Sequence, residues 1–235
     1  MMDFSAVKSL VIPEGEVKSI SSGGVLLWKS GSAIGDLPTG TVVYMMETEY
    51  TPYIVIAHGH HGAGMTTMLR KNVSVYCNFH NSAPSSAYYN RYSTSTLKSQ
   101  MALLFNALPE ATRKKIQTVG IPVRESANSS TVGESFSANF FALSTMELTG
   151  DGVQVEGSHI SWFADASSRI ATDGTSEKAY WTRSVVGGMN NFAKTIGTTG
   201  AEANASVTTN NYLRPACCVA SDTELTERNG QYYME

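Results

Sequence analysis

Residues 53–67, YIVIAHGHHGAGMTT, decide which class of fold the chain can adopt. From Gly59 they spell G-x4-G-M-T, one residue away from the phosphate-binding loop G-x4-G-K-[ST]. That loop needs a lysine to reach the phosphates and a helix whose N-terminus faces the anion. Met65 replaces the lysine, and the residues that follow alternate as in a strand. The stretch therefore predicts two strands joined by a surface loop, and it argues against a nucleotide-binding site.

The same loop raises the question of a metal site. His58 and His60 are two positions apart, so they would face the same way in an extended backbone. One such pair from each chain of a threefold assembly would supply six imidazoles to a transition metal. The flanking glycines predict a mobile loop, however, and no acidic residue lies close in the sequence to orient the rings. We predict no metal and no cofactor, and keep His58 and His60 as weak candidates in an oligomer.

Bulk composition describes a globular chain with neither a nucleic-acid nor a membrane signature. The 235 residues are 42% apolar and 16% charged, with a net charge of −3, and the longest basic block is residues 113–115. A nucleic-acid partner would normally leave a larger basic footprint. No run approaches the roughly 20 apolar residues that span a bilayer, and no secretory signal is apparent at the N-terminus.

Catalytic patterns are missing from the sequence. There is no G-x-S-x-G and no H-E-x-x-H pattern, and Glu147 with Asp165 is a weak candidate for an acid–base pair. The three cysteines, Cys77, Cys217 and Cys218, have no zinc-type spacing and are expected to be reduced thiols. We predict no catalytic residue.

The order of the segments predicts two regions. Residues 7–12, 17–20 and 25–28 have the composition of short strands separated by glycine-rich turns. A meander of this size is too small to hold its own core, so residues 1–33 are predicted to form an N-terminal β segment that docks on something else. Residues 30–40 are predicted to be a linker, and residues 34–235 to form the body.

The body is predicted to be α+β. Strands are expected at 41–46 and 53–57, and a helix at 93–108 with Ser93 or Ser95 as its cap. Pro109 is expected to open a second short helix. Everything beyond Val119 is predicted to be strand and loop.

Residues 180–185, YWTRSV, are predicted to form a strand with Trp181 and Arg183 on one face. An arginine inside a β core must be paired, because an unpaired buried charge costs several kcal/mol. Glu147 is the candidate partner for Arg183 or Arg214. The alternative is that Trp181 and Arg183 bind a ligand.

Several short motifs together resemble a family of uncharacterised domains common in Firmicutes phages and prophages. They are YWTRS (180–184), YLRPA (212–216), FFALSTMEL (140–148), the helical stretch 93–116, TTMLRKNV (66–73) and DLPTGTVV (36–43). The N-terminal VIPEGEV…GGVLLW is similar to a leader on tail and baseplate proteins of such phages, which implies attachment to the tail. The W-x-R-S and R-P-A pattern also resembles C-type-lectin-like folds, whose phage members display variable surfaces to hosts.

The resemblance implies a C-type-lectin-like body with two mid-chain helices. It implies a virion protein of the tail tip or baseplate, assembled in the host cytoplasm, that binds a host-surface glycan or protein. Other tail subunits are the implied partners, the chain is expected to be a homo-oligomer, and no nucleic acid or membrane insertion is involved. Two alternatives remain: a tail or capsid decoration protein with a purely stabilising role, and an oxidative enzyme that uses Cys217 and Cys218.

By this analogy the displayed region is 186–211. The expected ligand-binding residues are Trp181, Arg183, Asn190, Asn191, Phe192, Asn204, Asn210, Asn211 and Tyr212.

Overall fold

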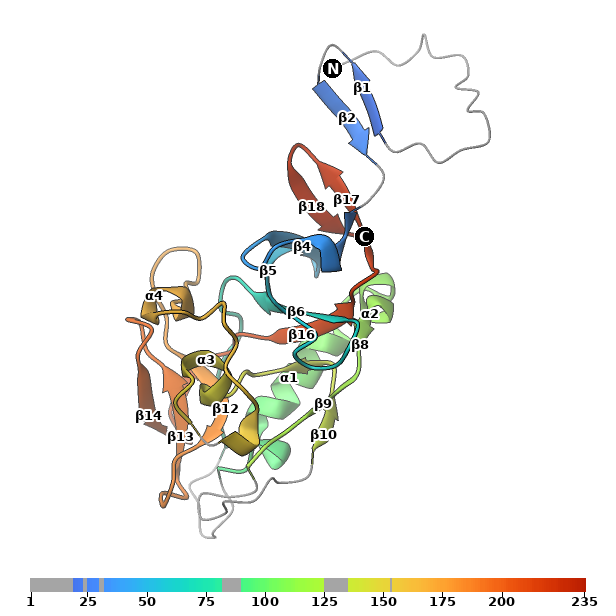
Figure 1. Ribbon diagram of the computed structural model, residues 1–235. Coiled ribbons are helices and arrows are strands. Elements are labelled where there is room, and N and C mark those ends of the chain that lie inside the picture. Colours follow the sequence, from blue (N-terminus) through green and yellow to red (C-terminus); the bar gives the residue numbers. More distant parts are fainter. Residues whose placement is uncertain (1–18, 23–24, 30–31, 82–89, 125–134, 153) are drawn as a thin grey trace.

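The computed structural model describes residues 19–22, 25–29, 32–81, 90–124, 135–152 and 154–235 (Figure 1). These described residues are 39% strand and 18% helix, and they form several sheets and four short α-helices. The expected α+β fold with a C-type-lectin-like body is therefore wrong, and the chain has a β-rich fold. The physical reason is that the α-helices of the described residues have only 11, 6, 5 and 4 residues, too few to form a helical layer of their own beside the sheets.

The large sheet contains nine strands. Their bounds are β3 Ser32–Ala33, β4 Val42–Met46, β5 Tyr50–His58, β6 Met65–Arg70, β8 Ile116–Gln117, β11 Phe140–Phe141, β16 Ala216–Ala220, β17 Glu224–Arg228 and β18 Gln231–Met234. The order is β11-β16-β6-β5-β4-β18-β17-β3, and β8 also pairs with β16. Strand β18 runs parallel to β4, which brings the C-terminus back beside the first strand of the body.

Strands β5 and β6 form the centre of this sheet and confirm the two strands predicted on either side of the histidine loop. They pair antiparallel, with His58 opposite Thr66. Residues 59–64 make the turn, and three of their glycines have positive φ (71° at Gly59, 140° at Gly62 and 72° at Gly64), which suits residues without a Cβ. Residues 53–56 and 66–69 are buried, so the sequence pattern here belongs to a core sheet.

The second sheet has five strands: β7 Tyr76–Asn78, β12 Tyr180–Val185, β13 Phe192–Ile196, β14 Glu202–Ser206 and β15 Asn210–Tyr212. Their order is β14-β13-β12-β15-β7. All six residues of β12 are buried, so this central strand of the second sheet is covered on both faces. Strands β9 Val119–Ile121 and β10 Phe136–Ala138 form a separate antiparallel pair.

The α-helices are α1 Thr96–Asn106, α2 Glu110–Lys115, α3 Thr145–Thr149 and α4 Ala166–Arg169, and the 3₁₀ helices are η1 Ile34–Asp36, η2 Tyr92–Thr94 and η3 Gln154–Glu156. Helix α1 begins after Ser95, whose side chain accepts from the Lys98 N–H, as the sequence predicts. Pro109 caps α2 from just outside the helix. Helices α3 and α4 correct the prediction of strand and loop beyond Val119. No helix among the described residues is long and apolar enough to cross a membrane.

The N-terminal region contains a two-stranded antiparallel sheet, β1 Ser19–Ser22 and β2 Val25–Lys29. The predicted strand at 7–12 lies outside the described residues. Residues 32–36 correct the predicted linker at 30–40, because β3 pairs with β17 and the side chain of Ile34 is fully buried in the core of the body.

Candidate functional site

Helix α3 carries the acidic residue on which the buried polar groups converge. Ser144 and Glu147 form a capping box: the Ser144 hydroxyl accepts from the Glu147 N–H at 3.1 Å, and Glu147 Oε2 accepts from the Ser144 N–H at 2.8 Å. Gly150 ends the helix with φ 73°. The short helix therefore fixes both the position and the rotamer of Glu147, whose side chain is 1% exposed.

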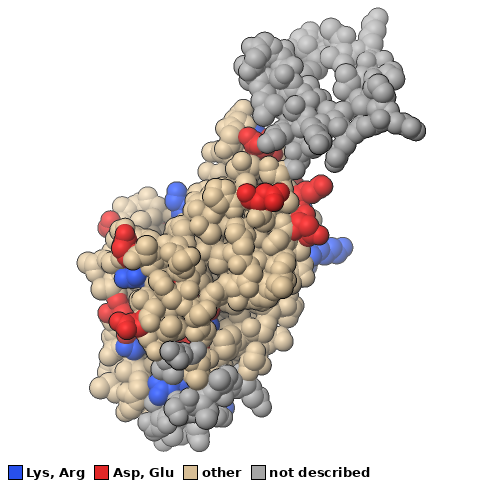
Figure 2. Space-filling model, viewed as in Figure 1, with Lys and Arg blue, Asp and Glu red and all other residues tan. Residues whose placement is uncertain are grey.

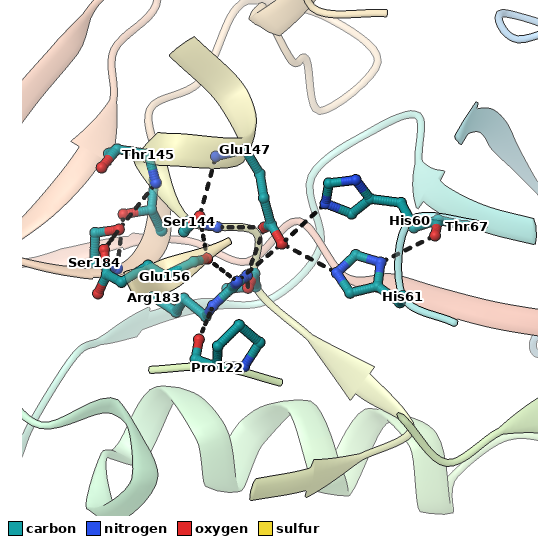
Figure 3. Close-up of polar contacts among 12 residues, drawn as sticks. His60, His61, Thr67, Pro122, Ser144, Thr145, Glu147, Glu156, Arg183 and Ser184 are labelled. Carbon is teal, nitrogen blue, oxygen red and sulfur yellow. Dashed lines mark hydrogen bonds and ion pairs between the residues drawn. The ribbon is translucent and has the colours of Figure 1, made fainter. Parts of the chain in front are cut away.

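Arg183, on β12, pairs with Glu147 in the interior. Its Nη1 lies 2.6 Å from Oε2 and its Nη2 lies 2.9 Å from Oε1 of the carboxylate. The remaining N–H groups donate to the carbonyl oxygens of Pro122, Ala142 and Glu156 at 2.6–3.0 Å. All five donors of the guanidinium are thus satisfied, which is what makes a fully buried arginine tolerable (Figure 3).

Two histidines of the β5–β6 turn reach the other side of the same carboxylate. His61 Nε2 lies 3.0 Å and His60 Nε2 lies 3.6 Å from Glu147 Oε1, and the side chains are 4% and 13% exposed. His61 Nδ1 is 3.0 Å from Thr67 Oγ1 on β6. Figure 3 shows both rings pointing from the turn toward the end of the Glu147 side chain. The sequence has no acidic residue close to these histidines. The carboxylate that they face belongs to Glu147, which is 86 positions from His61 in the sequence.

Protonation in this cluster follows from burial and charge. Burial lowers the pKa of His61, opposed by the hydrogen bond and charge of Glu147. Burial by itself would raise the pKa of Glu147, but the charge of Arg183 and the hydrogen bonds from both histidines hold that pKa well below its usual value. The cluster therefore presents an ionised Glu147 carboxylate beside the His61 imidazole, whose burial favours the neutral form.

His58 does not belong to the cluster. Its Nδ1 is 3.0 Å from Thr66 Oγ1 and its Nε2 is 2.9 Å from the Leu37 carbonyl oxygen. The sequence spacing predicted that His58 and His60 act together. In the structure only His60 faces Glu147, and its partner there is His61. In the turn the backbone is not extended, so the rule that alternate residues share a face does not apply.

The chain Thr67–His61–Glu147 has the connectivity of a nucleophile, a base and an orienting acid. Thr67 is 0% exposed, inside the sheet, and no substrate atom can approach its hydroxyl. Accessible chemistry at this place is limited to what the two imidazoles and the carboxylate can do, which is to hold a proton or a cation.

On the far side of Arg183, Glu156 extends the network. The Ser184 hydroxyl donates to Glu156 Oε2 at 2.5 Å and accepts from the Thr145 N–H at 2.9 Å. The Ser144 hydroxyl donates to the Glu156 carbonyl at 3.0 Å. Burial raises the pKa of Glu156, against the hydrogen bond from Ser184 and the charge of Arg183. Sequence reasoning missed this residue, because nothing in its local pattern distinguishes it from a surface glutamate.

An open pocket of about 730 Å³ lies next to Glu156. Elements α3, η3, α4, β12, β13 and β14 contribute to its wall, and its polar lining includes Thr149, Asp151, Glu156, Arg169, Lys194 and Glu202. Lys194 pairs with Glu202 across β13 and β14. Arg169 donates to the carbonyl oxygens of Gly200 and Leu148 at 2.9 and 3.3 Å. Five of the twelve lining residues come from residues 185–202, inside or beside the region expected to be displayed.

The expected ligand-binding residues do not form one surface. Trp181 and Arg183 are buried, and the Trp181 indole donates to the Cys77 carbonyl at 2.9 Å. Exposed and partly exposed positions are Asn190, Asn191, Phe192, Asn204, Asn210, Asn211 and Tyr212. Arg214 is buried away from Glu147 and donates to the carbonyl oxygens of Arg70, Lys71 and Arg169. The structure thus places Glu147 with Arg183 and not with Arg214.

A family model described as Domain of unknown function (DUF6273) matches residues 63–221, which is more than half of the chain. This range contains Glu147, Arg183 and the pocket, and it begins just after His61. Comparison with the curated proteins finds no match, and neither does comparison with the solved structures.

Proposed function

This chain belongs to the family described as Domain of unknown function (DUF6273), and we propose that it is a non-enzymatic protein of a phage tail tip or baseplate that binds the host surface. Support for the tail location is the resemblance of YWTRS, YLRPA and the N-terminal leader to phage tail proteins. In this proposal the N-terminal segment attaches to neighbouring tail subunits, the chain forms a homo-oligomer, and the body presents its binding surface outward.

The observation that carries the binding role is the open polar pocket of about 730 Å³ beside β13 and β14. Its volume lies in the range that binds small ligands or a few sugar units. The Asp151 carboxylate has no hydrogen-bond or ion-pair partner among the residues that the structure describes, so it is available to a ligand. Hydroxyl-rich ligands suit a wall that mixes both signs of charge with hydroxyl groups, and we therefore propose a host-surface glycan as the ligand class.

Charge distribution agrees with a neutral polyhydroxyl ligand better than with a polyanion. In Figure 2 acidic and basic side chains alternate along the left edge, where Figure 1 shows α4, β13 and β14. A nucleic acid or another polyanion would gain no net attraction there, because Asp151, Glu156 and Glu202 offset the positive charges of Arg124, Arg169 and Lys194. Affinity per site would be modest, and copies repeated on one virion would multiply it.

A sedimentation assay on cell walls tests this proposal. The fluorescently labelled full chain is mixed with purified cell walls of the bacterium whose phage or prophage encodes it, and the bound fraction is measured against protein concentration. We expect saturable binding by the wild type. Asp151→Ala and Lys194→Ala should each weaken it about tenfold, the loss expected for one hydrogen bond to a charged group.

Lys114→Ala is the matched control. It removes an exposed cation from α2, which Figure 1 shows on the opposite side of the body from β13 and β14. It should bind as the wild type does. Failure of the wild type to bind, or equal binding by the two pocket variants, would overturn the proposal. The alternative is a decoration protein with a stabilising role. It would be indicated if the pocket variants bind as the wild type does and a particle reconstruction shows the body buried between virion subunits.

A further inference from the structure

The turn between β5 and β6 and helix α3 bring together three groups that ligate transition metals. We propose that His60 Nε2, His61 Nε2 and Glu147 Oε1 bind one divalent ion of the zinc class. These ligand atoms all lie within 4.8 Å of one another. Two imidazoles and one carboxylate with an open fourth position is a common ligand set for Zn²⁺.

The spacing fits a tetrahedral ion with little movement. Ligand atoms about 2.0–2.1 Å from a tetrahedral Zn²⁺ are separated by roughly 3.3 Å. The two nitrogen-to-oxygen distances here are 3.0 Å for His61 and 3.6 Å for His60, on either side of that value. The side chain of His60 is 13% exposed, so solvent reaches the cluster and gives the ion a route in and a water for the fourth position.

The groups around the cluster already make the contacts that a metal ligand needs from its surroundings. Metal binding uses the lone pair of His61 Nε2, so the proton of the neutral ring must sit on Nδ1. There it can donate to Thr67 Oγ1, which lies 3.0 Å away. If the His61 ring is neutral before the metal binds, it keeps its one proton, which moves from Nε2 to Nδ1. If the ring is protonated, metal binding releases one proton to solvent.

Arg183 decides how strongly the site depends on both histidines. It donates Nη2 to Glu147 Oε1 at 2.9 Å, which leaves the second lone pair of that oxygen for the ion. Its positive charge also opposes a second cation nearby. The carboxylate alone therefore cannot retain the ion, and loss of either imidazole should weaken binding by about 100-fold or more. This dependence separates a built site from weak surface binding to a lone histidine.

The test uses the untagged full chain, stripped with a chelator and titrated with Co²⁺ and then with Zn²⁺. Tetrahedral Co²⁺ absorbs strongly in the visible range, so its spectrum reports geometry as well as stoichiometry. We expect one ion per chain, displacement of Co²⁺ by Zn²⁺, and a rise in the thermal unfolding midpoint on loading. His60→Ala should weaken binding by about 100-fold or more, since even an outer partner of a ligand is worth about 10–100-fold.

His58→Ala is the control, because this residue lies at the same turn but faces Leu37 and Thr66. It should bind as tightly as the wild type. Glu147 is left unchanged, since its loss would also strip Arg183 of its partner. X-ray absorption of the Zn²⁺-loaded wild type gives a result independent of any variant: two imidazoles with oxygen ligands are expected. No saturable binding by the wild type, an imidazole-free shell, or equal binding by His60→Ala would overturn the proposal.

Discussion

Glu147 and Arg183 form a two-point ion pair in the interior, with side chains 1% and 0% exposed. Because neither charge reaches water, removal of one partner leaves the other unpaired at low dielectric. Arg183→Met should therefore lower the free energy of unfolding by about 3–5 kcal/mol. Urea unfolding followed by tryptophan fluorescence measures this.

A double-mutant cycle adds the second half of this prediction. Glu147→Gln in the Arg183→Met background should cost less than Glu147→Gln alone, since the carboxylate then has no arginine to lose. Glu110→Gln serves as the control, because its pair with Lys114 on α2 is exposed and should contribute little. Additive costs for the two interior variants would show that the pair is not coupled as the distances indicate.

Glu156 makes the free energy of unfolding depend on pH. Comparison of the wild type with the Glu156→Gln variant isolates this contribution. Burial raises the pKa of Glu156 above its ordinary value of 4.5. The folded state thus binds this proton more tightly than the unfolded state does, and the stabilising contribution is present below pH 4.5 and lost as pH rises through the folded pKa. Glu156→Gln cannot undergo this loss.

The variant should therefore gain stability relative to the wild type as pH rises from 4 to 7. Every other group, including Glu147 with its lowered pKa, titrates in both proteins and cancels in the difference. Chemical denaturation of both proteins across this range measures the effect. A difference that is flat, or that changes in the opposite direction, would contradict the assignment of a raised pKa to Glu156.

The three thiols are predicted to be unreactive in the folded protein. Cys217 and Cys218 are fully buried on β16, and burial raises the pKa of Cys77 and of Cys218 to about 11. At pH 8 only a small fraction of either is thiolate, the reactive form. Reaction with a disulfide reagent should be slow in buffer and complete in denaturant. One rapid equivalent under native conditions would instead favour the cysteine-based oxidative activity, and the Cys217→Ser and Cys218→Ser variants would locate it.

Local patterns predicted several of the elements, but helices α3 and α4 were missed and the assembly of the elements was not predicted. The strand at Tyr180–Val185 and the cap of α1 at Ser95 follow from side-chain alternation and from a short-range hydrogen bond. Helix α3 has the equally local signal S-x-x-E at residues 144–147, a capping box that sequence reasoning could have recognised. The fold class failed because strand order in a sheet depends on pairings between distant residues, such as β18 with β4.

The candidate site was also predicted only in part: the ion pair follows from a local rule, and the approach of the histidines does not. A buried arginine demands a carboxylate, and on this rule Glu147 is predicted as the partner of Arg183 or Arg214; the structure pairs it with Arg183. The approach of His61 to the same carboxylate could not be predicted, because it depends on three glycines that curl the turn away from an extended backbone. The pocket beside Glu156 is also a product of assembly, since its walls come from six separate elements.

Gly200 and Gly188 allow the packing of the pocket wall to be tested with a matched pair. Both have positive φ, 78° and 72°. A Cβ at Gly200 would lie 1.8 Å from the carbonyl oxygen of Ala166 on α4, whereas a Cβ at Gly188 would meet nothing within 4 Å. Gly188→Ala should cost about 1–2 kcal/mol, the penalty for a left-handed backbone. Gly200→Ala carries that penalty and a clash with backbone, so its cost should exceed about 4 kcal/mol.

The same substitution should reach the pocket. The Gly200 carbonyl accepts from Arg169 Nε at 2.9 Å, so a shift of this turn away from α4 breaks the hydrogen bond that positions the guanidinium. Thermal unfolding of the two variants, with binding to cell walls measured below both midpoints, separates stability from function. Gly188→Ala should bind normally, and Gly200→Ala should bind more weakly even where it is folded. Equal costs for the two variants would show that α4 does not approach the β13–β14 turn as closely as the structure places it.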